Sequence, residues 1–194
     1  PESWQIVLSD FSLGMLESTQ RNLQDLAHAI RFEQIDAESI PFADEQFDGV
    51  IANHMLYYVD DKAQAFSEIW RVLKPGGVFY ASTIGRHHLR ELKELVGRFE
   101  FNPLLTNLER IEQSFLLETG MSQMAEWFPN VFMRRYEDTL LVTEVEPLVD
   151  YVMSSEVLRV ENRAGFADYL QEQLEAHQGT IQIHKDSGIF IASK

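Results

Sequence analysis

Acidic side chains follow two apolar segments of the chain, at positions where they could bind a nucleotide. Asp10 comes just after the apolar run at 4–8, and a carboxylate there can accept hydrogen bonds from both ribose hydroxyls. Asp36 follows the next apolar segment, where it could accept a hydrogen bond from the exocyclic amine of adenine. Each has a structural alternative, because Asp10 could simply cap the helix that starts after Ser12, and Asp36 could close an ordinary turn.

A third polar group, Asn53 and His54, follows the apolar segment at 47–52. An imidazole can act as a general base or can line a small-molecule pocket. The alternative is a half-buried histidine whose hydrogen bonds are satisfied within the fold. The other side chains open to the same two interpretations, base or packing, are Tyr57, Tyr58, His87 and His88.

Alternating strands and helices in the first 83 residues must position these groups. The apolar pattern predicts strands at 4–8, 29–35, 47–52 and 78–82. Helices are expected between them, one after Ser12 and one capped by Asp60 or Asp61 and ended by Pro75-Gly76-Gly77. Strands that alternate with helices pair in parallel through right-handed crossovers, so their carboxyl ends meet at one edge of the sheet. We therefore expect the polar groups to gather at that edge.

After Gly85 the pattern changes to successive helices. They are expected at 87–99, from a capping box at Thr106-Asn107-Leu108-Glu109 to about Leu117, and at 120–128. Strand character returns at 131–142 and 180–192, with a kink or bulge at 186–188, and helices that include Pro147 and 164–177 lie between. We expect a single domain, with a cofactor half at 1–83, a helical lid or substrate insertion at 84–128, and C-terminal strands and helices of the same sheet at 129–194.

Three segments, in this order and at these separations, resemble the class I S-adenosylmethionine-dependent methyltransferases, and in particular their small-molecule branch. The segments are VLSDFSLGMLE, IDAESIPFADEQFDGVIANHMLYYVDD and EIWRVLKPGGVFYAST. The resemblance is close over 4–83, holds in outline over 129–194 and hardly reaches 84–128. It implies an α/β fold with a doubly wound, mostly parallel sheet, a helical insertion and an antiparallel C-terminal strand. It also implies S-adenosylmethionine as cofactor and methyl transfer to a small-molecule acceptor.

The resemblance also implies a set of cofactor-binding residues, carried over position by position. They are Asp10 at the ribose, Phe11 and Met15 against the adenosine, Asp36 and the Ala37 amide at the adenine, and Asn53 and His54 at the methionine end. The catalytic residues stay open, because a sulfonium methyl group needs no acid catalyst and needs a base only if the acceptor carries a proton.

The chain departs from the family in one respect, because it contains no Gly-x-Gly sequence. In the family, a first strand and its glycine-rich loop precede the strand that corresponds to 4–8, so we expect an N-terminal truncation that removes both. That strand lies between those at 4–8 and 47–52, which should therefore pair directly, accept another chain or exchange elements between copies. We expect weak or no binding of S-adenosylmethionine, and a homodimer or strand-swapped assembly.

Composition narrows the partners further. The chain has 16 basic and 31 acidic side chains and a formal net charge of −15, which repels a phosphate backbone. Cysteine is absent, which excludes disulfides, a thiol nucleophile and cysteine-ligated zinc. No apolar stretch is long enough to span a bilayer, and no signal peptide pattern is present. We expect a cytoplasmic enzyme with no nucleic-acid, membrane or metal partner.

Three other interpretations stay open. A non-catalytic nucleotide-binding or interaction protein of the same fold could do without the glycine loop. A nicotinamide-dependent oxidoreductase fits the acid after the strand but not the Leu73–Gly77 turn. A methyltransferase acting on protein or nucleic acid is disfavoured by the acidic charge and the lack of basic runs.

Overall fold

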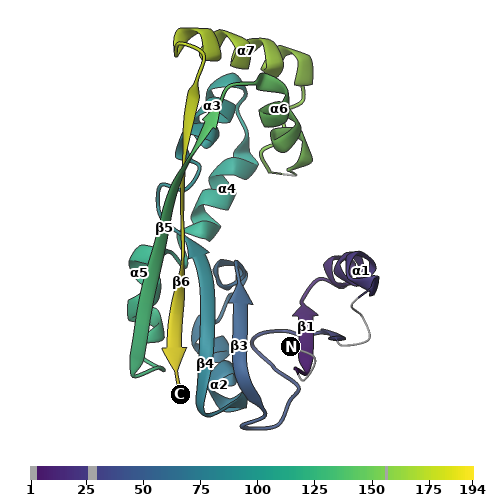
Figure 1. Cartoon of the computed structure of the whole chain (residues 1–194), viewed down its shortest axis with the longest axis vertical. Helices are drawn as coiled ribbons and strands as arrows, with labels where there is room; N and C mark the ends of the chain where they lie inside the picture. Colours follow the sequence, from purple (N-terminus) through teal and green to yellow (C-terminus); the bar gives the residue numbers. More distant parts are fainter. Residues whose placement is uncertain (1–3, 26–29, 156) are drawn as a thin grey trace.

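Two β-sheets and the helices around them make up the computed structural model, which describes residues 4–25, 30–155 and 157–194 (Figure 1). The smaller sheet pairs β1 (Ile6–Asp10) with β2 (Ile30–Gln34) in parallel. The larger sheet has the order β3 (Phe47–Asn53), β4 (Leu73–Ile84), β6 (Ile181–Ser193), β5 (Asn130–Val142). Its β3–β4 pairing is parallel and the other two are antiparallel. The α/β fold class is confirmed, with a mixed larger sheet.

The helix α1 (Leu13–Asn22) follows β1 and begins as the sequence predicts. Ser12 is its N-cap, and its Oγ accepts a hydrogen bond from the Met15 amide at 3.4 Å. The apolar positions of this helix in the sequence, which include Leu13, Leu16 and Leu23, predict a buried stripe, and this prediction is wrong in part: Leu16 is buried, but Leu13 is 53% exposed. The predicted stripe also includes Leu26, which lies outside the described residues. The two-stranded sheet beside α1 is too narrow to cover the whole apolar side of the helix.

The segment between β3 and β4 contains a short 3-10 helix, η2 (Leu56–Tyr58), and the helix α2 (Lys62–Val72). Asp61 is the α2 cap, since its Oδ1 accepts a hydrogen bond from the Gln64 amide at 2.9 Å. The buried face of α2 consists of Ala65, Phe66, Ile69 and Val72. The helix ends where the sequence predicts, but β4 starts directly at Leu73, and the predicted Pro-Gly-Gly turn is an irregular start of that strand.

Three helices follow β4 and two more lie between β5 and β6. They are α3 (Arg90–Phe99), α4 (Pro103–Glu112), α5 (Leu117–Met124), α6 (Val145–Ser154) and α7 (Arg163–Ala176). The predicted capping box is wrong, because Thr106 lies inside α4. Proline is well suited to the first helical position, and Asn102 Oδ1 accepts a hydrogen bond from the Leu104 amide at 2.9 Å. The start of α4 is therefore set by Asn102 and Pro103.

The strands β5 and β6 form an unbroken antiparallel pair along their whole length of 13 residues. The predicted bulge at 186–188 is therefore wrong. A Cβ on Gly188 would lie 2.6 Å from the Arg134 carbonyl oxygen, so glycine lets the strands approach here without a kink. Beyond the end of β4, this pair continues as a two-stranded ribbon toward α3, α6 and α7 (Figure 1).

Within the described ranges, most of the buried apolar residues form two separate clusters. One contains residues of α3, α6 and α7 together with Ile181 and Ile183 of β6. The other lies between the larger sheet, α2 and α5, and it includes Phe190 and Ala192 of the same strand. Thus β6 runs through both cores. Among the described residues, no helix has both the length and the apolar character that crossing a membrane requires.

Candidate active site

Asp10, Phe11 and Met15 lie at the carboxyl end of β1 and in the first turn of α1. Asp10 Oδ1 accepts a hydrogen bond from the Ser12 amide at 2.8 Å, which fixes the carboxylate at the strand end. Asp10 therefore closes a turn before the helix and is not its cap, which is Ser12, and the contact occupies only one carboxylate oxygen. Phe11 and Met15 are 71% and 58% exposed, so both side chains have apolar surface free for contact with another molecule.

Asp36 and Ala37 follow β2 on the same edge of the small sheet. Asp10 pairs with Gln34 in the parallel ladder, so Asp36 lies two residues past the level of Asp10. Asp36 Oδ1 accepts a hydrogen bond from the Glu38 amide at 2.9 Å. The smaller sheet therefore brings two exposed or half-buried carboxylates to one edge, each fixed by one hydrogen bond.

Asn53 and His54 lie at the carboxyl end of β3 in the larger sheet. Ser82 of β4 joins them: its Oγ donates to Asn53 Oδ1 at 2.6 Å and accepts from the His54 amide at 3.0 Å. His54 has a φ of +51°, an unusual value for a residue with a side chain. Partial burial lowers the pKa of His54, which favours a neutral imidazole at pH 7.

The proposed cofactor residues thus fall into two groups. Asp10, Phe11, Met15, Asp36 and Ala37 belong to the small sheet and its helix, whereas Asn53 and His54 belong to the larger sheet. In the described ranges β1 pairs with β2 alone and β3 with β4 alone. Direct pairing between the segments at 4–8 and 47–52, one of three expected outcomes, is therefore not found. The arrowheads of β1 and β3 point the same way in Figure 1, so both groups lie at carboxyl ends on the same side.

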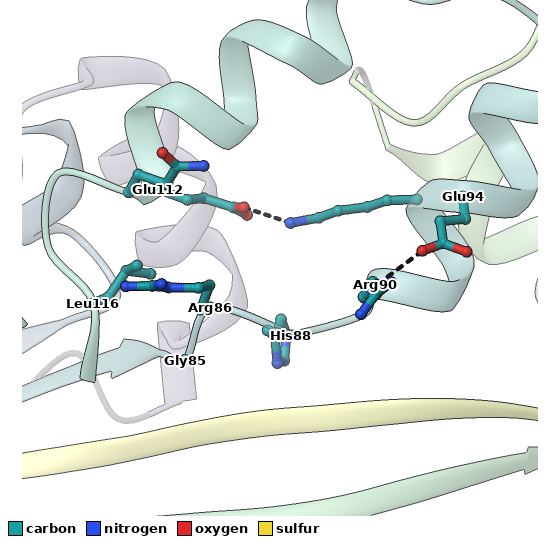
Figure 2. A pocket seen from close by; sticks show the side chains of 9 residues that line it. Gly85, Arg86, His88, Arg90, Glu94, Glu112 and Leu116 are labelled. Carbon is teal, nitrogen blue, oxygen red and sulfur yellow. Dashed lines mark hydrogen bonds and ion pairs between the residues drawn. The ribbon is translucent and has the colours of Figure 1, made fainter. Parts of the chain in front are cut away.

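A polar cavity of about 300 Å³ lies beside the carboxyl end of β4 (Figure 2). Arg86 and His88 line it from the loop after β4, Arg90 and Lys93 from α3, and Glu112 from the end of α4. The cavity thus joins the edge of the sheet to the two helices that follow it.

An ion pair between α3 and α4 crosses this cavity. Lys93 Nζ and Glu112 Oε2 are 2.5 Å apart, and their side chains are only 13% and 15% exposed. On the outer side, Arg90 Nε pairs with Glu94 Oε1 at 2.8 Å, one turn further along α3. Both acids of the cavity are therefore engaged by a base.

His88 is half-buried, and a hydrogen bond from the neighbouring strand fixes the tautomer of its neutral ring. Its Nδ1 accepts a hydrogen bond from the Asp186 amide at 3.0 Å, so the neutral ring carries its hydrogen on Nε2. Burial, followed by the positive charge of Lys93, lowers the pKa of His88. The loop that carries His88 follows Ser82, which pairs with Asn53 and accepts the hydrogen bond of the His54 amide, so the cavity lies on the sheet edge where β3 ends.

An ion pair between the buried Asp186 and the more exposed Arg135 forms the floor beneath this loop. Asp186 is 6% exposed, and Arg135 binds both of its carboxylate oxygens, at 2.7 Å through Nε and at 2.5 Å through Nη2. The Gly85 amide donates to the Asp186 carbonyl oxygen at 3.0 Å. A Cβ on Gly85 would lie 1.9 Å from Asp186 Oδ2, so only glycine fits at this position.

The remaining tyrosines and His87 differ in their surroundings. Burial, together with the charges of Tyr58 and Glu112, raises the pKa of Tyr57 to about 12, so its hydroxyl stays protonated at neutral pH. Tyr58 is 61% exposed, and His87 is exposed. A second, mostly apolar cavity of about 510 Å³ adjoins His88 on the side of α6 and includes Leu140 and Tyr151.

The sequence does not point to Arg86, Lys93 or Glu112. The two partners of the Lys93–Glu112 pair are 19 residues apart and lie on separate helices, so no spacing rule connects them. A charged residue on an amphipathic helix normally indicates the solvent-facing side. The packing of α3 against α4 is what brings these charges together.

Comparison with known proteins gives a sequence match to one family of domains. Residues 2–81 match the model of a methyltransferase domain. The chain is 36% identical over 121 residues to the biotin biosynthesis bifunctional protein BioHC of Teredinibacter turnerae. This alignment covers 60% of this chain and 21% of that protein. The chain is 35% identical over 105 residues to the ubiquinone/menaquinone biosynthesis C-methyltransferase UbiE of Haemophilus ducreyi, 53% of this chain and 40% of that enzyme. The aligned part thus spans less than half the length of these relatives.

Solved structures share the fold. A phosphoethanolamine N-methyltransferase 2 of Haemonchus contortus, solved with phosphomonomethylethanolamine and S-adenosylhomocysteine, superposes with a TM-score of 0.57. The superposition covers 98% of this chain and 43% of that one, at 17% identity, and therefore concerns the fold alone. The chain thus matches a methyltransferase domain over residues 2–81 and shares its α/β fold with solved methyltransferase structures.

Proposed function

We propose that the chain takes part in transferring a methyl group from S-adenosylmethionine to a small-molecule acceptor. The observation that carries this proposal is the family match over residues 2–81, within which two carboxylates, Asp10 and Asp36, end neighbouring parallel strands. The formal net charge of −15 favours a small molecule over a nucleic acid as the acceptor.

The residues present fit an adenosine-containing cofactor. In the described chain, Asp10 and Asp36 each use Oδ1 for a backbone amide, which leaves Oδ2 to accept hydrogen bonds from ribose hydroxyls and from the adenine amine. The exposed side chains of Phe11 and Met15 are available to pack on the adenosine, and the Ala37 amide lies next to Asp36. S-adenosylmethionine, when bound, supplies an electrophilic methyl group on a sulfonium.

The methionine end of the cofactor would lie at Asn53 and His54, on the larger sheet. In the transfer, the acceptor's nucleophilic atom forms a bond to the methyl carbon as the carbon–sulfur bond breaks, and the electron pair stays on sulfur. A proton on the acceptor atom, where there is one, has to leave. The neutral imidazole of His54, whose pKa is lowered, can accept it, and so can water.

Binding of the cofactor would depend on two sheets that no strand pairing joins in the described chain. We therefore propose that the isolated chain binds S-adenosylmethionine weakly. We also propose that copies associate through the unpaired edges of β1 and β3. Ile51 of β3 is 73% exposed and Ile6 of β1 is 41% exposed, and unpaired apolar strand edges favour association. A monomer at all concentrations in analytical ultracentrifugation would contradict the association.

Equilibrium dialysis of the purified chain against labelled S-adenosylmethionine tests the site. We expect a dissociation constant well above the micromolar range and a further loss of at least tenfold in the variant D10A. The control is E17A, which removes an exposed acid on α1 outside the proposed site. Micromolar binding by the chain alone would contradict the proposed weakness. Equal binding by D10A and E17A would contradict the assignment of Asp10 to the cofactor.

A further inference from the structure

The cavity beside β4 contains one more basic side chain than acidic ones. Its bases are Arg86, Arg90 and Lys93, and its acids are Glu94 and Glu112. Lys93 pairs with Glu112 and Arg90 pairs with Glu94, which engages both acids. Within the described ranges no carboxylate forms an ion pair with Arg86. A guanidinium without a partner, in a cavity otherwise neutral, is a binding group for an oxyanion.

A neutral donor in the same cavity, His88, adds to the preference for an oxyanion. His88 accepts through Nδ1 from the Asp186 amide, so its Nε2 carries a hydrogen that can be donated to a ligand. The N-terminus of α3 starts at this wall but adds no free donor, because Glu91 lies in its first turn and the Arg90 amide donates to the His87 carbonyl oxygen at 3.2 Å.

The nearest other acids, Asp186 and Glu118, share one guanidinium, that of Arg135, and so keep one negative charge between them. Asp186 is bound through both oxygens by Arg135, and Glu118 pairs with the same guanidinium at 3.0 Å. Glu118 also accepts the hydrogen bond of the Arg86 amide at 3.1 Å, so the backbone of Arg86 is fixed independently of its side chain. The side chain can therefore be changed without loss of the loop.

We propose that this cavity binds an oxyanion, and that the oxyanion is the carboxylate or phosphate group of the methyl acceptor, with Arg86 as its ion-pair partner and His88 as a neutral donor. The assignment to the acceptor rests on the proposed methyl transfer. The cavity starts at Gly85, shortly after Ser82 of β4, and the Ser82 Oγ accepts a hydrogen bond from the His54 amide at 3.0 Å. The bound anion would therefore lie on the same sheet edge as the proposed methionine end of the cofactor.

The overall charge of the protein opposes the binding of an anion, so an anionic acceptor would need a local basic group. At a formal net charge of −15, an anionic acceptor is repelled by the molecule as a whole. A single unpaired base in a cavity with about 300 Å³ of space overcomes this repulsion only for a ligand that reaches it. The site therefore selects acceptors that carry an anionic group within reach of the methyl donor.

The test uses the whole chain without cofactor, so that its result does not depend on methyl transfer. Inorganic phosphate and, separately, acetate are titrated at constant ionic strength, and the ring signals of His88 are followed by NMR. We expect saturable shifts with at least one anion, a loss of affinity of at least tenfold in R86Q, and partial recovery in R86K. The matched control is R110Q, which makes the same charge change on α4 outside the cavity and should bind as the wild type does.

The two arms distinguish the chemistry of the acceptor group: tighter binding of phosphate indicates a phosphorylated acceptor, and tighter binding of acetate indicates a carboxylate. If R86Q binds like the wild type, or if R110Q loses as much affinity as R86Q, the proposed anion site is wrong. If anion binding depends on Arg86 while D10A leaves S-adenosylmethionine binding unchanged, the anion site stands and the cofactor assignment fails.

Discussion

Replacing Gly85 by alanine tests whether the Asp186–Arg135 pair is the rigid floor of the loop after β4. The new methyl group would be placed 1.9 Å from Asp186 Oδ2 and 2.4 Å from its Cγ. An ordinary contact between such atoms is about 3.5–4 Å, so either the carboxylate or the loop has to move by more than 1 Å. The carboxylate cannot turn away freely, because two hydrogen bonds from Arg135 hold it.

The expected cost follows from these two routes. If the loop shifts and the ion pair stays intact, the overpacking costs about 1–3 kcal/mol. If Asp186 swings out of the pair, the cost rises toward, but stays below, the ~3–5 kcal/mol seen when a fully buried ion pair is broken, because the Arg135 side chain is 35% exposed. We therefore expect G85A to lose about 2–4 kcal/mol of unfolding free energy, which corresponds to roughly 4–16 °C in Tm for a chain of this size.

Urea denaturation followed by circular dichroism measures this loss. The control is G97A in α3, where the new Cβ meets its nearest atom, Leu105 Cδ2, at an ordinary 3.8 Å. Because alanine is a better helix former than glycine, G97A should be neutral or more stable by about 0.5–1 kcal/mol. A G85A variant within about 0.5 kcal/mol of the wild type would show that Asp186 is mobile and would refute the reasoning.

Three further predictions concern stability. The variant R71A should lose about 2–3 kcal/mol of unfolding free energy, because Arg71 donates to the carbonyl oxygens of Ile40 and Phe42 at 2.8 and 2.7 Å. Thermal unfolding tests this loss, and an unchanged Tm would contradict it. The hydrogen bond from Arg71 lowers the pKa of Glu68 below its ordinary 4.5, so the stability that Glu68 contributes is complete above pH 4.5 and is lost as the pH falls through the lower pKa of the folded state. Urea denaturation between pH 3 and 6 should therefore show a smaller loss of unfolding free energy on acidification in E68Q than in the wild type, and equal losses would exclude this role. Thr83 is fully buried and donates to the Phe115 carbonyl oxygen at 2.7 Å, so T83V should lose about 1–3 kcal/mol of unfolding free energy in urea denaturation. An unchanged stability of T83V would show that water replaces this hydrogen bond.

Much of the fold could be predicted from the sequence because its signals are local. The alternation of apolar strands and capped helices up to residue 83 depends on neighbouring residues, such as Ser12 for α1 and Asp61 for α2. The helix boundaries after β4 were harder to predict. A Thr-x-x-Glu pattern at Thr106 matches a capping box in sequence, but Asn102 and Pro103 start the helix earlier.

The expected bulge in β6 shows a different limit. Asp186-Ser187-Gly188 has the composition of a turn, yet the segment continues as regular strand because Arg135 of β5 binds the aspartate and the strand spacing needs the glycine. Both reasons involve residues more than 45 positions away. The same holds for the cavity beside β4, whose charges come from three elements. Asp10, Asp36 and Asn53 could be proposed as cofactor-binding residues from the sequence, because each follows a predicted strand.

The strand β6 has a consequence for how the molecule unfolds. Its first residues, including Ile181 and Ile183, belong to the helical core, and its last, including Phe190 and Ala192, belong to the core of the larger sheet. Neither core can lose its order while the other keeps this strand fully packed, so the two are energetically linked and should melt in one transition. Every part of β6 also pairs with residues at least 39 positions earlier in the chain, as between Ile181 and Val142, and such long loops slow folding. Assembly of both cores therefore waits for the same late event, the docking of one strand.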